Sequence, residues 1–529
     1  MKIYNIIKKG IILLGILIFT FSCDDYLEEE AITDISADFV YNSAEGLETG
    51  VVGLYNFNRQ LYENGRHEWF SSIMLASRTD LAIPRAGVLS LFGKYHWGIS
   101  QNGYQATPLM SFYWQHYYKI VDRANAIIKG AEELSDIDEV QRAKIIAQAK
   151  FYRAQSYFTL YRMFNNIYVT EEPSDPQNAF DVINDKTPVD QIFTLINSDL
   201  SYAIEHLEWS TPDFGRITQG AARHVKAKVA LWEKDWDEAK FQSEEIINEG
   251  PYSLMPNTGD VFLGDLNNNE TILAIQYADG LPGGSSVSMI NFNFIPRYER
   301  APGMKLAQDL GGKGGGFLLP NNYLLNLIAE DENDTRDDDT YFRLKYYYND
   351  GDNLPDDVNL GDEVMVYAPT TDPDNPSATN NQYYERIHPT CLKFIQEDND
   401  PELQVQISNI MVYRLAETYL IAAEANMMTG GDALMYLNAV RTRAGAAEAT
   451  IVDQQAILDE RARELAFEGQ RWFTLKRMGV LEFQIVNYHG DDYYKADGRT
   501  KFLPQYVNFP IPQSQLDLMG PSFPQNDGF

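Results

Sequence analysis

Three glutamates, Glu460, Glu464 and Glu468, are spaced by four residues, which places their carboxylates on one face of a helix. Paired carboxylates with different pKa values are the catalytic groups of glycosidases. The same stretch contains four basic residues, which are Arg461, Arg463, Arg471 and Lys476. Neighbouring cations favour the ionised carboxylate, so they oppose the raised pKa that a catalytic acid needs. We therefore predict that this cluster forms structural ion pairs and contains no catalytic residue.

Other motifs of catalysis and cofactor binding are missing from the sequence. There is no HExxH, GxSxG or CxxC pattern, and the run Gly311–Gly316 lacks the order of a phosphate-binding loop. The seven histidines show no paired spacing of metal ligands. We expect a protein that is not an enzyme and that binds no cofactor.

Two acidic runs, Asp331–Asp339 and Asp350–Asp362, carry crowded carboxylates that could hold a structural calcium ion. Neither run has the EF-hand order of ligands around a central glycine. Solvated loops are the simpler interpretation, and the sequence favours it over a calcium site.

Two groups of aromatic and basic residues could bind a flat ligand by stacking and hydrogen bonding. The first group, Phe92, Tyr95 and Trp97, lies in an aromatic stretch rich in loop-forming residues between Gly65 and Pro108. The second group comprises Phe292, Arg297 and Tyr298, with Phe294 and Arg300 beside them. We predict these as ligand-binding candidates, although each ring could instead be buried in the core.

Apolar residues recur at three- and four-residue steps through much of the chain, which predicts amphipathic helices. We expect these helices to position the candidate binding residues. The predicted helical segments are Ala44–Tyr62, Ser111–Leu134, Val140–Phe164, a pair within Pro188–Leu207, a hairpin within Thr218–Leu254 that turns at Lys234, and three consecutive helices within Asn409–Gly479. The alanine-rich hairpin is typical of tetratricopeptide repeats, whose helix pairs must stack to bury their apolar faces. We count about four such pairs.

The segment between Pro256 and Asn409 has a different character, with short apolar runs, turns and glycines. Thr271–Tyr277 is its clearest strand candidate. We therefore expect a mainly α fold, in which an irregular part with a few short strands lies on a helical scaffold.

Composition limits the partners of this 529-residue chain. A formal net charge of −33 disfavours nucleic acid and anionic membrane surfaces and suits an uncharged or cationic ligand. Hydrophobic residues make up 44% of the chain and aromatic residues 13%, so a large core can form. The two cysteines, Cys23 and Cys391, provide no disulfide framework.

The first residues indicate export. Lys2, Lys8 and Lys9 precede an uncharged run from Gly10 to Phe21, and Ser22 stands directly before Cys23. We predict a lipoprotein signal peptide at residues 1–22 with acylation of Cys23. An uncleaved membrane anchor is the alternative, but the run is shorter than the ~20 residues that span a bilayer. An acidic tether at residues 23–36 then serves either as a surface-export signal or as a solvated linker.

Several motifs in the second half of the chain resemble those of one family, the RagB/SusD nutrient-binding outer-membrane lipoproteins. They are Tyr413–Glu417, Leu437–Arg441, Arg443–Gly445, Glu464–Gly469 with Arg471 and Trp472, Phe509–Gln513 and Gln525–Phe529. Thr474, Met478 and Asp527 depart from the family pattern at scaffold positions. The resemblance extends over essentially the whole chain after Cys23.

The resemblance implies one SusD-like domain at residues 37–529. Its helical scaffold would comprise residues 37–255 and 405–480, with a variable irregular part at about 256–404 and an extended tail at 481–529. Four tetratricopeptide-like helix pairs would form the scaffold. The signature residues are structural in this family, so we expect no ligand contact from Asn409–Gly479.

The resemblance also implies a function, a location and a partner. The protein would be anchored to the outer membrane by lipid at Cys23, exposed at the cell surface, and would capture an oligosaccharide for a TonB-dependent, SusC-like transporter. Family members commonly display a stacking aromatic near the position of Trp97. The alternatives are a peptide or another nutrient as ligand, an architectural transporter subunit without ligand, and a glycosidase.

Overall fold

Helices dominate the part of the chain that the computed structural model describes. The described residues are 40–62, 75–84, 108–178, 180–277, 290–337, 339–364, 387–395, 400–403, 409–489 and 502–529. Within these ranges no helix is both long enough and apolar enough to cross a bilayer.

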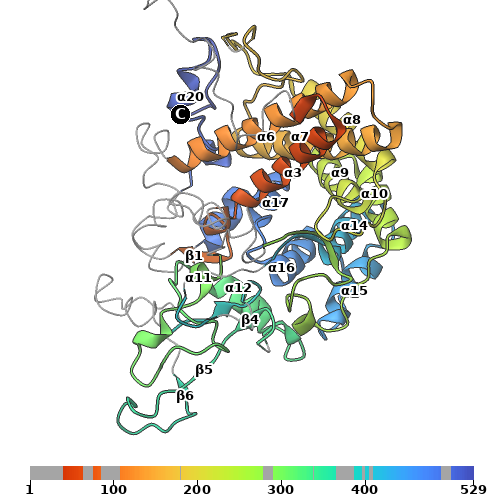
Figure 1. Ribbon diagram of the computed structural model, residues 1–529. Coiled ribbons are helices and arrows are strands. Elements are labelled where there is room, and N and C mark those ends of the chain that lie inside the picture. Colours follow the sequence, from red (N-terminus) through yellow and green to blue (C-terminus); the bar gives the residue numbers. More distant parts are fainter. Residues whose placement is uncertain are drawn as a thin grey trace, which may run out of the picture.

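Eight helices form the scaffold, and each packs against the next in chain order. They are α3 (Ala44–Gln60), α6 (Pro108–Glu133), α7 (Glu139–Phe164), α8 (Val189–His206), α9 (Gln219–Glu233), α10 (Trp236–Glu249), α14 (Leu415–Thr429) and α15 (Ala433–Arg443). Taken two at a time they give the four stacked pairs that the sequence predicts (Figure 1). The predicted pair within residues 188–207 is wrong, because this segment is the single helix α8.

Small residues and caps explain why these helices form and pack closely. Ala227 and Ala230 of α9 meet Ala239 of α10 and Ala425 of α14 in one buried cluster, and these small side chains let the helix backbones approach closely. The predicted turn after α9 is confirmed, since Lys234 ends the helix in the left-handed conformation. Asp432 and Asp453 accept hydrogen bonds from backbone N–H groups in the first turns of α15 and of α16 (Gln454–Leu465), as their place before each helical pattern indicates.

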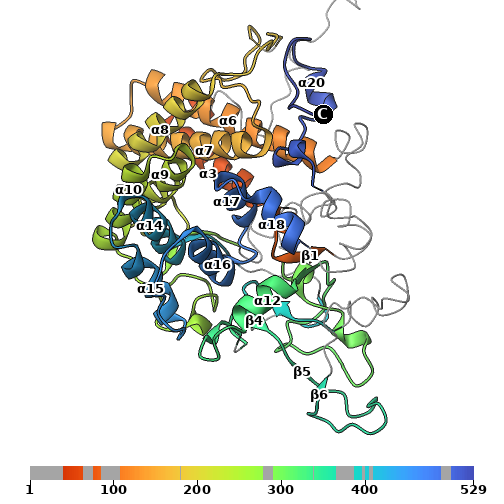
Figure 2. The same cartoon turned by 180° about the vertical axis from the view of Figure 1, so that it is seen from behind.

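An irregular insert separates α10 from α14. It contains the short helices α11 (Ile290–Phe294) and α12 (Asn322–Ile328), and the strands β2 (Thr271–Ile275), β3 (Leu318–Pro320), β4 (Phe342–Arg343), β5 (Tyr346–Tyr347), β6 (Glu363–Val364), β7 (Thr390–Cys391) and β8 (Ile410–Arg414). Every strand pair is antiparallel: β1 (Ala82–Pro84) with β3, β2 with β8, β4 with β7, and β5 with β6. The insert thus leaves and rejoins the helical stack at the β2–β8 pair (Figure 2).

Three predictions about the chain after residue 408 need correction. Val412 and Tyr413 belong to β8 and not to a helix, because pairing with β2 overrides their helical spacing. The predicted third helix is broken between α16 and α17 (Arg471–Arg477), where Phe467 and Gly469 have positive φ angles of 68° and 84°. The tail begins with another helix, α18 (Leu481–Tyr488), where we expected an extended chain.

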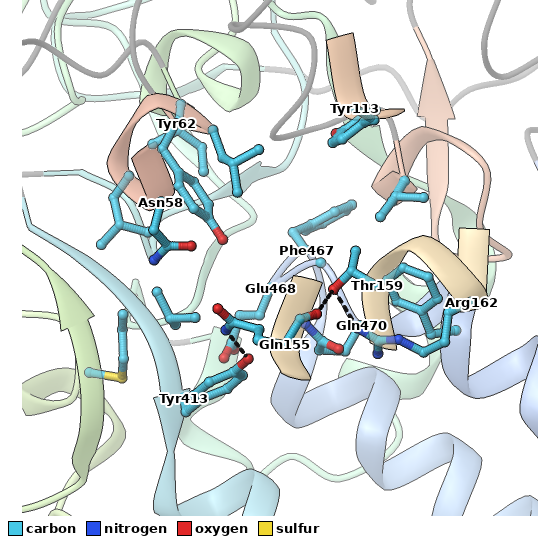
Figure 3. Close-up of a pocket in the computed structure, with 18 of the residues that line it drawn as sticks. Asn58, Tyr62, Tyr113, Gln155, Thr159, Arg162, Tyr413, Phe467, Glu468 and Gln470 are labelled. Carbon is cyan, nitrogen blue, oxygen red and sulfur yellow. Dashed lines mark hydrogen bonds between the residues drawn. The ribbon is translucent and has the colours of Figure 1, made fainter. Parts of the chain in front are cut away.

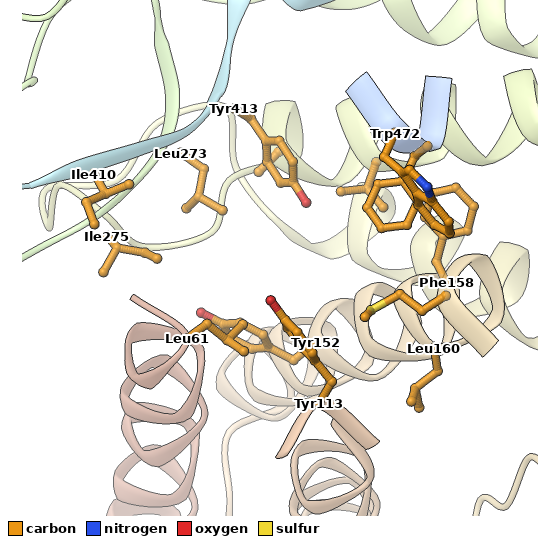
Figure 4. Close-up of a cluster of buried hydrophobic side chains, with 14 of the residues drawn as sticks. Leu61, Tyr113, Tyr152, Phe158, Leu160, Leu273, Ile275, Ile410, Tyr413 and Trp472 are labelled. Carbon is orange, nitrogen blue, oxygen red and sulfur yellow. The ribbon is translucent and has the colours of Figure 1, made fainter. Parts of the chain in front are cut away.

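The core lies where the helices meet the β2–β8 pair. Figure 4 shows Leu61, Tyr113 and Tyr152 at the ends and faces of α3, α6 and α7, opposite Leu273 of β2 and Ile410 of β8. The C-terminal residues close this core from the outside, since the Phe509 N–H donates to the Met163 carbonyl oxygen at 2.9 Å. Residues far apart in the sequence therefore share one apolar interior.

Buried ion pairs join the insert to the scaffold. Glu464 accepts hydrogen bonds from Arg414 at 2.6 Å, from Arg336 at 3.1 Å and from Arg443. Glu460 accepts from Arg336 at 2.6 Å, and neither glutamate is exposed to solvent. The structural role predicted for the glutamates is thus confirmed.

The main partners of these glutamates come from other elements and not from the basic residues beside them in sequence. Arg461 binds Glu417, and Arg471 binds Asp80. Lys476 donates to the Arg162 carbonyl oxygen and to Asn508. Arg463 is the exception, since it binds Glu460 at 3.1 Å.

We expect Glu464→Gln to lower the free energy of unfolding by about 3–5 kcal/mol, because it leaves buried guanidinium groups without their shared counter-ion. Chemical denaturation followed by circular dichroism measures the change. Glu139→Gln is the matched control, since this carboxylate pairs with Arg142 but is 78% exposed and should contribute little. Equal stability of the two variants would contradict a structural role for the network.

The same network predicts a pH dependence. Burial alone raises the pKa of Glu464, but Arg443, Arg414 and Arg336 outweigh burial and hold this pKa well below its ordinary value of 4.5. A carboxylate with a lowered folded-state pKa stabilises the fold above its unfolded pKa, and this stabilisation is lost as the pH falls. Between about pH 6 and pH 3 the wild-type protein should therefore lose more stability than Glu464→Gln. Parallel denaturation curves at each pH test this, and identical losses would count against it.

Candidate functional site

A cavity of about 110 Å³ lies where the helical stack meets β8 and the break between α16 and α17. Its lining comes from the end of α3, from α6 and α7, from β8, and from the segment Phe467–Phe473. Ile290 and Phe394 of the insert complete it. Scaffold and insert therefore both contribute to this site.

Four phenols give the cavity its hydrogen-bonding character. Tyr62 and Tyr113 lie on one side and Tyr413 on another, while Tyr117 also contributes to the lining (Figure 3). Gln155 donates from its side-chain nitrogen to the Tyr413 hydroxyl oxygen at 2.6 Å. Burial raises the pKa of Tyr413 to about 12 and raises the pKa values of Tyr62 and Tyr117 as well. These hydroxyls stay protonated, so they can bind a polar ligand but do not act as general bases.

Two charged side chains also line the cavity. The Glu468 carboxylate is held by Arg414 at 2.8 Å and by Lys393 at 2.6 Å. Arg162 lies between the rings of Phe158 and Phe473, with its guanidinium carbon 4.1 and 3.9 Å from their centres. Burial lowers the pKa of Arg162 to about 10. Among the described residues that line the cavity there is one carboxylate, which is ion-paired, and not the opposed pair that glycoside hydrolysis requires.

Gln470 places in the lining of the cavity a side-chain oxygen that has no hydrogen-bond partner among the described residues. The side-chain oxygen of Gln470 is buried and accepts no hydrogen bond from the residues that the structure describes. Because buried polar atoms are normally paired, a hydroxyl or water in the cavity would satisfy it. The chemistry that the described lining offers is therefore hydrogen bonding beside aromatic rings, which suits a polar ligand.

The predicted ligand-binding residues that the structure describes, Phe292, Arg297 and Tyr298, do not line this cavity. Phe92, Tyr95 and Trp97 lie outside the described residues, so their prediction stays open. Phe292 is 8% exposed and packs near Phe317, while Tyr298 is fully buried and donates to the Ala307 carbonyl oxygen at 3.1 Å.

Arg297 is half-buried at the start of a short 3-10 turn. From α11 only Ile290 reaches the lining. Ligand contact by Phe292 or Tyr298 would need a different conformation from this one.

Sequence reasoning missed the phenols that the structure brings together. Tyr113 and Tyr117 are spaced by four on α6. The helical periodicity of apolar residues, however, marks their neighbours Trp114 and Tyr118 as the buried face. Tyr413, Phe467 and Gln470 belong to Asn409–Gly479, the stretch from which we expected no ligand contact. Nothing in a single sequence shows that these residues face the same cavity.

Carboxylates of the first acidic run, Asp331–Asp339, bind partners within the protein. Asp331 accepts from the Ala447 N–H at 2.6 Å, Asp334 binds Arg336 and Asp339 binds Arg343. No group of three or more potential metal-binding side chains occurs among the described residues. Calcium binding stays an untested prediction.

Comparison with known proteins identifies the family. A model described as the SusD family matches residues 269–529, and a model described as starch-binding associating with outer membrane matches residues 25–231. A SusD-like protein of Formosa agariphila is 28% identical, with 98% of this chain and 97% of that protein aligned. The starch-binding protein SusD of Bacteroides thetaiotaomicron is 24% identical over 77% of this chain and 76% of its own length.

Solved structures show the same fold. A laminarin binding SusD-like protein has a TM-score of 0.70 and 23% identity, and covers 92% of this chain and 100% of its own. Surface glycan-binding protein A from Bacteroides thetaiotaomicron, solved in complex with laminarihexaose, has a TM-score of 0.69 and 21% identity, with 91% and 99% of the two chains covered. The mainly α, SusD-like architecture is thus confirmed. The two family models together span most of the sequence, and the chain belongs to the SusD/RagB family.

Proposed function

We propose that this protein binds an oligosaccharide at the cell surface without cleaving it and delivers the oligosaccharide to a TonB-dependent, SusC-like transporter in the outer membrane. The observation that carries this proposal is the likeness to a protein named for binding starch, over 77% of this chain, and to one named for binding laminarin, over 92% of it. The cavity chemistry agrees, since neutral phenols and amides suit the hydroxyl groups of a sugar.

Charge further narrows the ligand class. With a formal net charge of −33, the protein repels polyanions over long range, so a neutral glycan is the ligand that fits best. The carboxylates support a non-catalytic role. Glu460, Glu464 and Glu468 are all bound by arginine or lysine, and the neighbouring arginines outweigh burial and lower the pKa values of Glu460 and Glu464, which opposes a general-acid role for these two.

The location is part of the same proposal. Acylation of Cys23 would hold the protein on the outer membrane, and the acidic residues 23–36 would keep the folded domain clear of the surface. Membrane fractionation of the full chain and of Cys23→Ser tests this attachment. Copurification of a TonB-dependent transporter from detergent-solubilised outer membranes tests the partner.

Trp97→Ala should weaken binding to a neutral glycan about fivefold, which corresponds to the loss of roughly 1 kcal/mol of stacking. Affinity gel electrophoresis against laminarin, starch, xylan and mannan, with a peptide mixture measured separately, gives the affinities. Tyr347→Ala is the matched control, because Tyr347 is an aromatic residue of the insert that is 51% exposed and lies outside the cavity.

The outcomes separate the alternatives. Binding of peptides with no binding of any glycan would replace the proposed ligand class. If the protein bound neither glycans nor peptides, the result would favour an architectural subunit of the transporter. New reducing ends after incubation with a bound glycan would show that the protein is an enzyme.

A further inference from the structure

A second and larger hollow lies on the insert, away from the cavity described above. This groove has a volume of about 630 Å³, within the range of roughly 300–1,000 Å³ that is common for small-ligand sites. It is lined by residues of four separate segments, around Phe262, Asp309, Arg343 and Leu392. None of its lining residues belongs to the central cavity.

The two hollows share a wall. In the segment that follows β7, Leu392 and Ile395 face the groove, whereas Phe394 lines the central cavity. Figures 1 and 2 show β4, which carries Arg343, beside α12 and on the side of the insert that leads to β5 and β6, away from α6 and α7. The groove is thus an additional surface feature of the insert.

Arg343 is held in a defined position beside the groove. It lies on β4, opposite Thr390 of β7, and its side-chain Nε donates to Asp339 at 3.1 Å. Its side chain is 11% exposed, and Nη1 has no hydrogen-bond partner among the described residues. Nη1 is itself buried and Nε is bound to Asp339, so a ligand in the groove would accept from the remaining N–H groups of this fixed guanidinium.

Asp309 adds an acceptor from a different segment. It is exposed and forms neither a hydrogen bond nor an ion pair within the described part of the chain. Together with Asp339 and Arg343 it gives the groove a local charge of −1, so an anionic ligand is disfavoured here.

The remaining wall is apolar. Phe262 meets the buried ring of Tyr341 edge to face at 5.3 Å, which fixes its orientation, and Leu263 is 44% exposed beside it. Leu392 and Ile395 extend this wall. A sugar ring matches a groove that has one polar wall and one apolar wall. Its C–H face is apolar, and the hydroxyl groups at its edge form hydrogen bonds.

We propose that this groove binds one or two neutral sugar units, with Arg343, Asp309 and Asp339 contacting hydroxyl groups and Phe262 and Leu263 covering the C–H face. This inference rests on the proposed function and names a second contact for the same glycan. A polysaccharide that occupies two sites on one protein molecule is bound more tightly than at either site alone. Once the first site is occupied, binding at the second site is an intramolecular step.

Asp309→Ala and Arg343→Ala test the groove by affinity gel electrophoresis in the full chain with Cys23→Ser, against laminarin, starch, xylan and mannan. Each variant should bind the retained neutral polysaccharide about three- to tenfold more weakly, as expected for the loss of one or two hydrogen bonds. Lys345→Ala is the matched control, because Lys345 is 62% exposed, lies two residues from Arg343 and does not line the groove. Asp309→Ala alters an exposed side chain, so its result does not depend on a change in folding.

Two results would overturn the groove proposal while leaving the proposed function intact. The first is unchanged retention of Asp309→Ala and Arg343→Ala on every polysaccharide that retains the unsubstituted protein. The second is an equal loss for Lys345→Ala, which would indicate a general charge effect. Failure of the unsubstituted protein to bind any neutral polysaccharide would instead overturn both proposals.

Discussion

Two fully buried carboxylates, those of Glu460 and Glu464, determine how the parts of this protein are joined. A charge removed from water is tolerated only when opposite charges and hydrogen bonds surround it. Here the counter-ions come from separate places: Arg336 from the insert, Arg414 from β8 and Arg443 from α15. Any arrangement that separates insert from scaffold would leave these charges unpaired. The network therefore holds the insert at a defined position on the helical stack, and the central cavity forms at this junction.

The use of charged side chains in the frame agrees with the proposed role of binding a ligand without cleaving it. The glutamates and arginines that would be the obvious catalytic groups are used in ion pairs, so the cavity has phenols and amides available for a ligand. The groove beside Arg343 lies on the insert and touches the network around Glu464 through Phe262, whose ring lies 5.4 Å from the Arg414 guanidinium carbon and packs on Tyr341. Asp309 and Arg343 form no ion pair with that network among the described residues, so they can differ without exposing the buried charges. A fixed frame that carries separate binding residues is one way in which a single fold can serve different ligands.

Much of the scaffold was predictable, because helical periodicity and caps are local. Asp432, Asp453 and the turn at Lys234 act as the sequence indicates. The predictions were wrong where contacts between segments far apart in the sequence determine the local structure. β8 is a strand because β2 lies beside it, and the break near Gly469 separates two segments that share one apolar pattern. Contacts between distant residues were harder to predict. In the ion-pair network, for example, Arg336 lies more than 120 residues before its partner Glu460 in the sequence. The cavity phenols come from several elements, so no local motif marks them.

Hydrogen–deuterium exchange with and without a bound neutral polysaccharide is the most direct test of this division between frame and binding surface. We predict slower exchange in the insert, in β8 and around Phe467–Gln470 when the polysaccharide is bound. Exchange in α9, α14 and α15 should stay unchanged, because these helices hold the frame and do not line either hollow along most of their length. Protection confined to α9, α14 and α15, with none in the insert, would contradict the account.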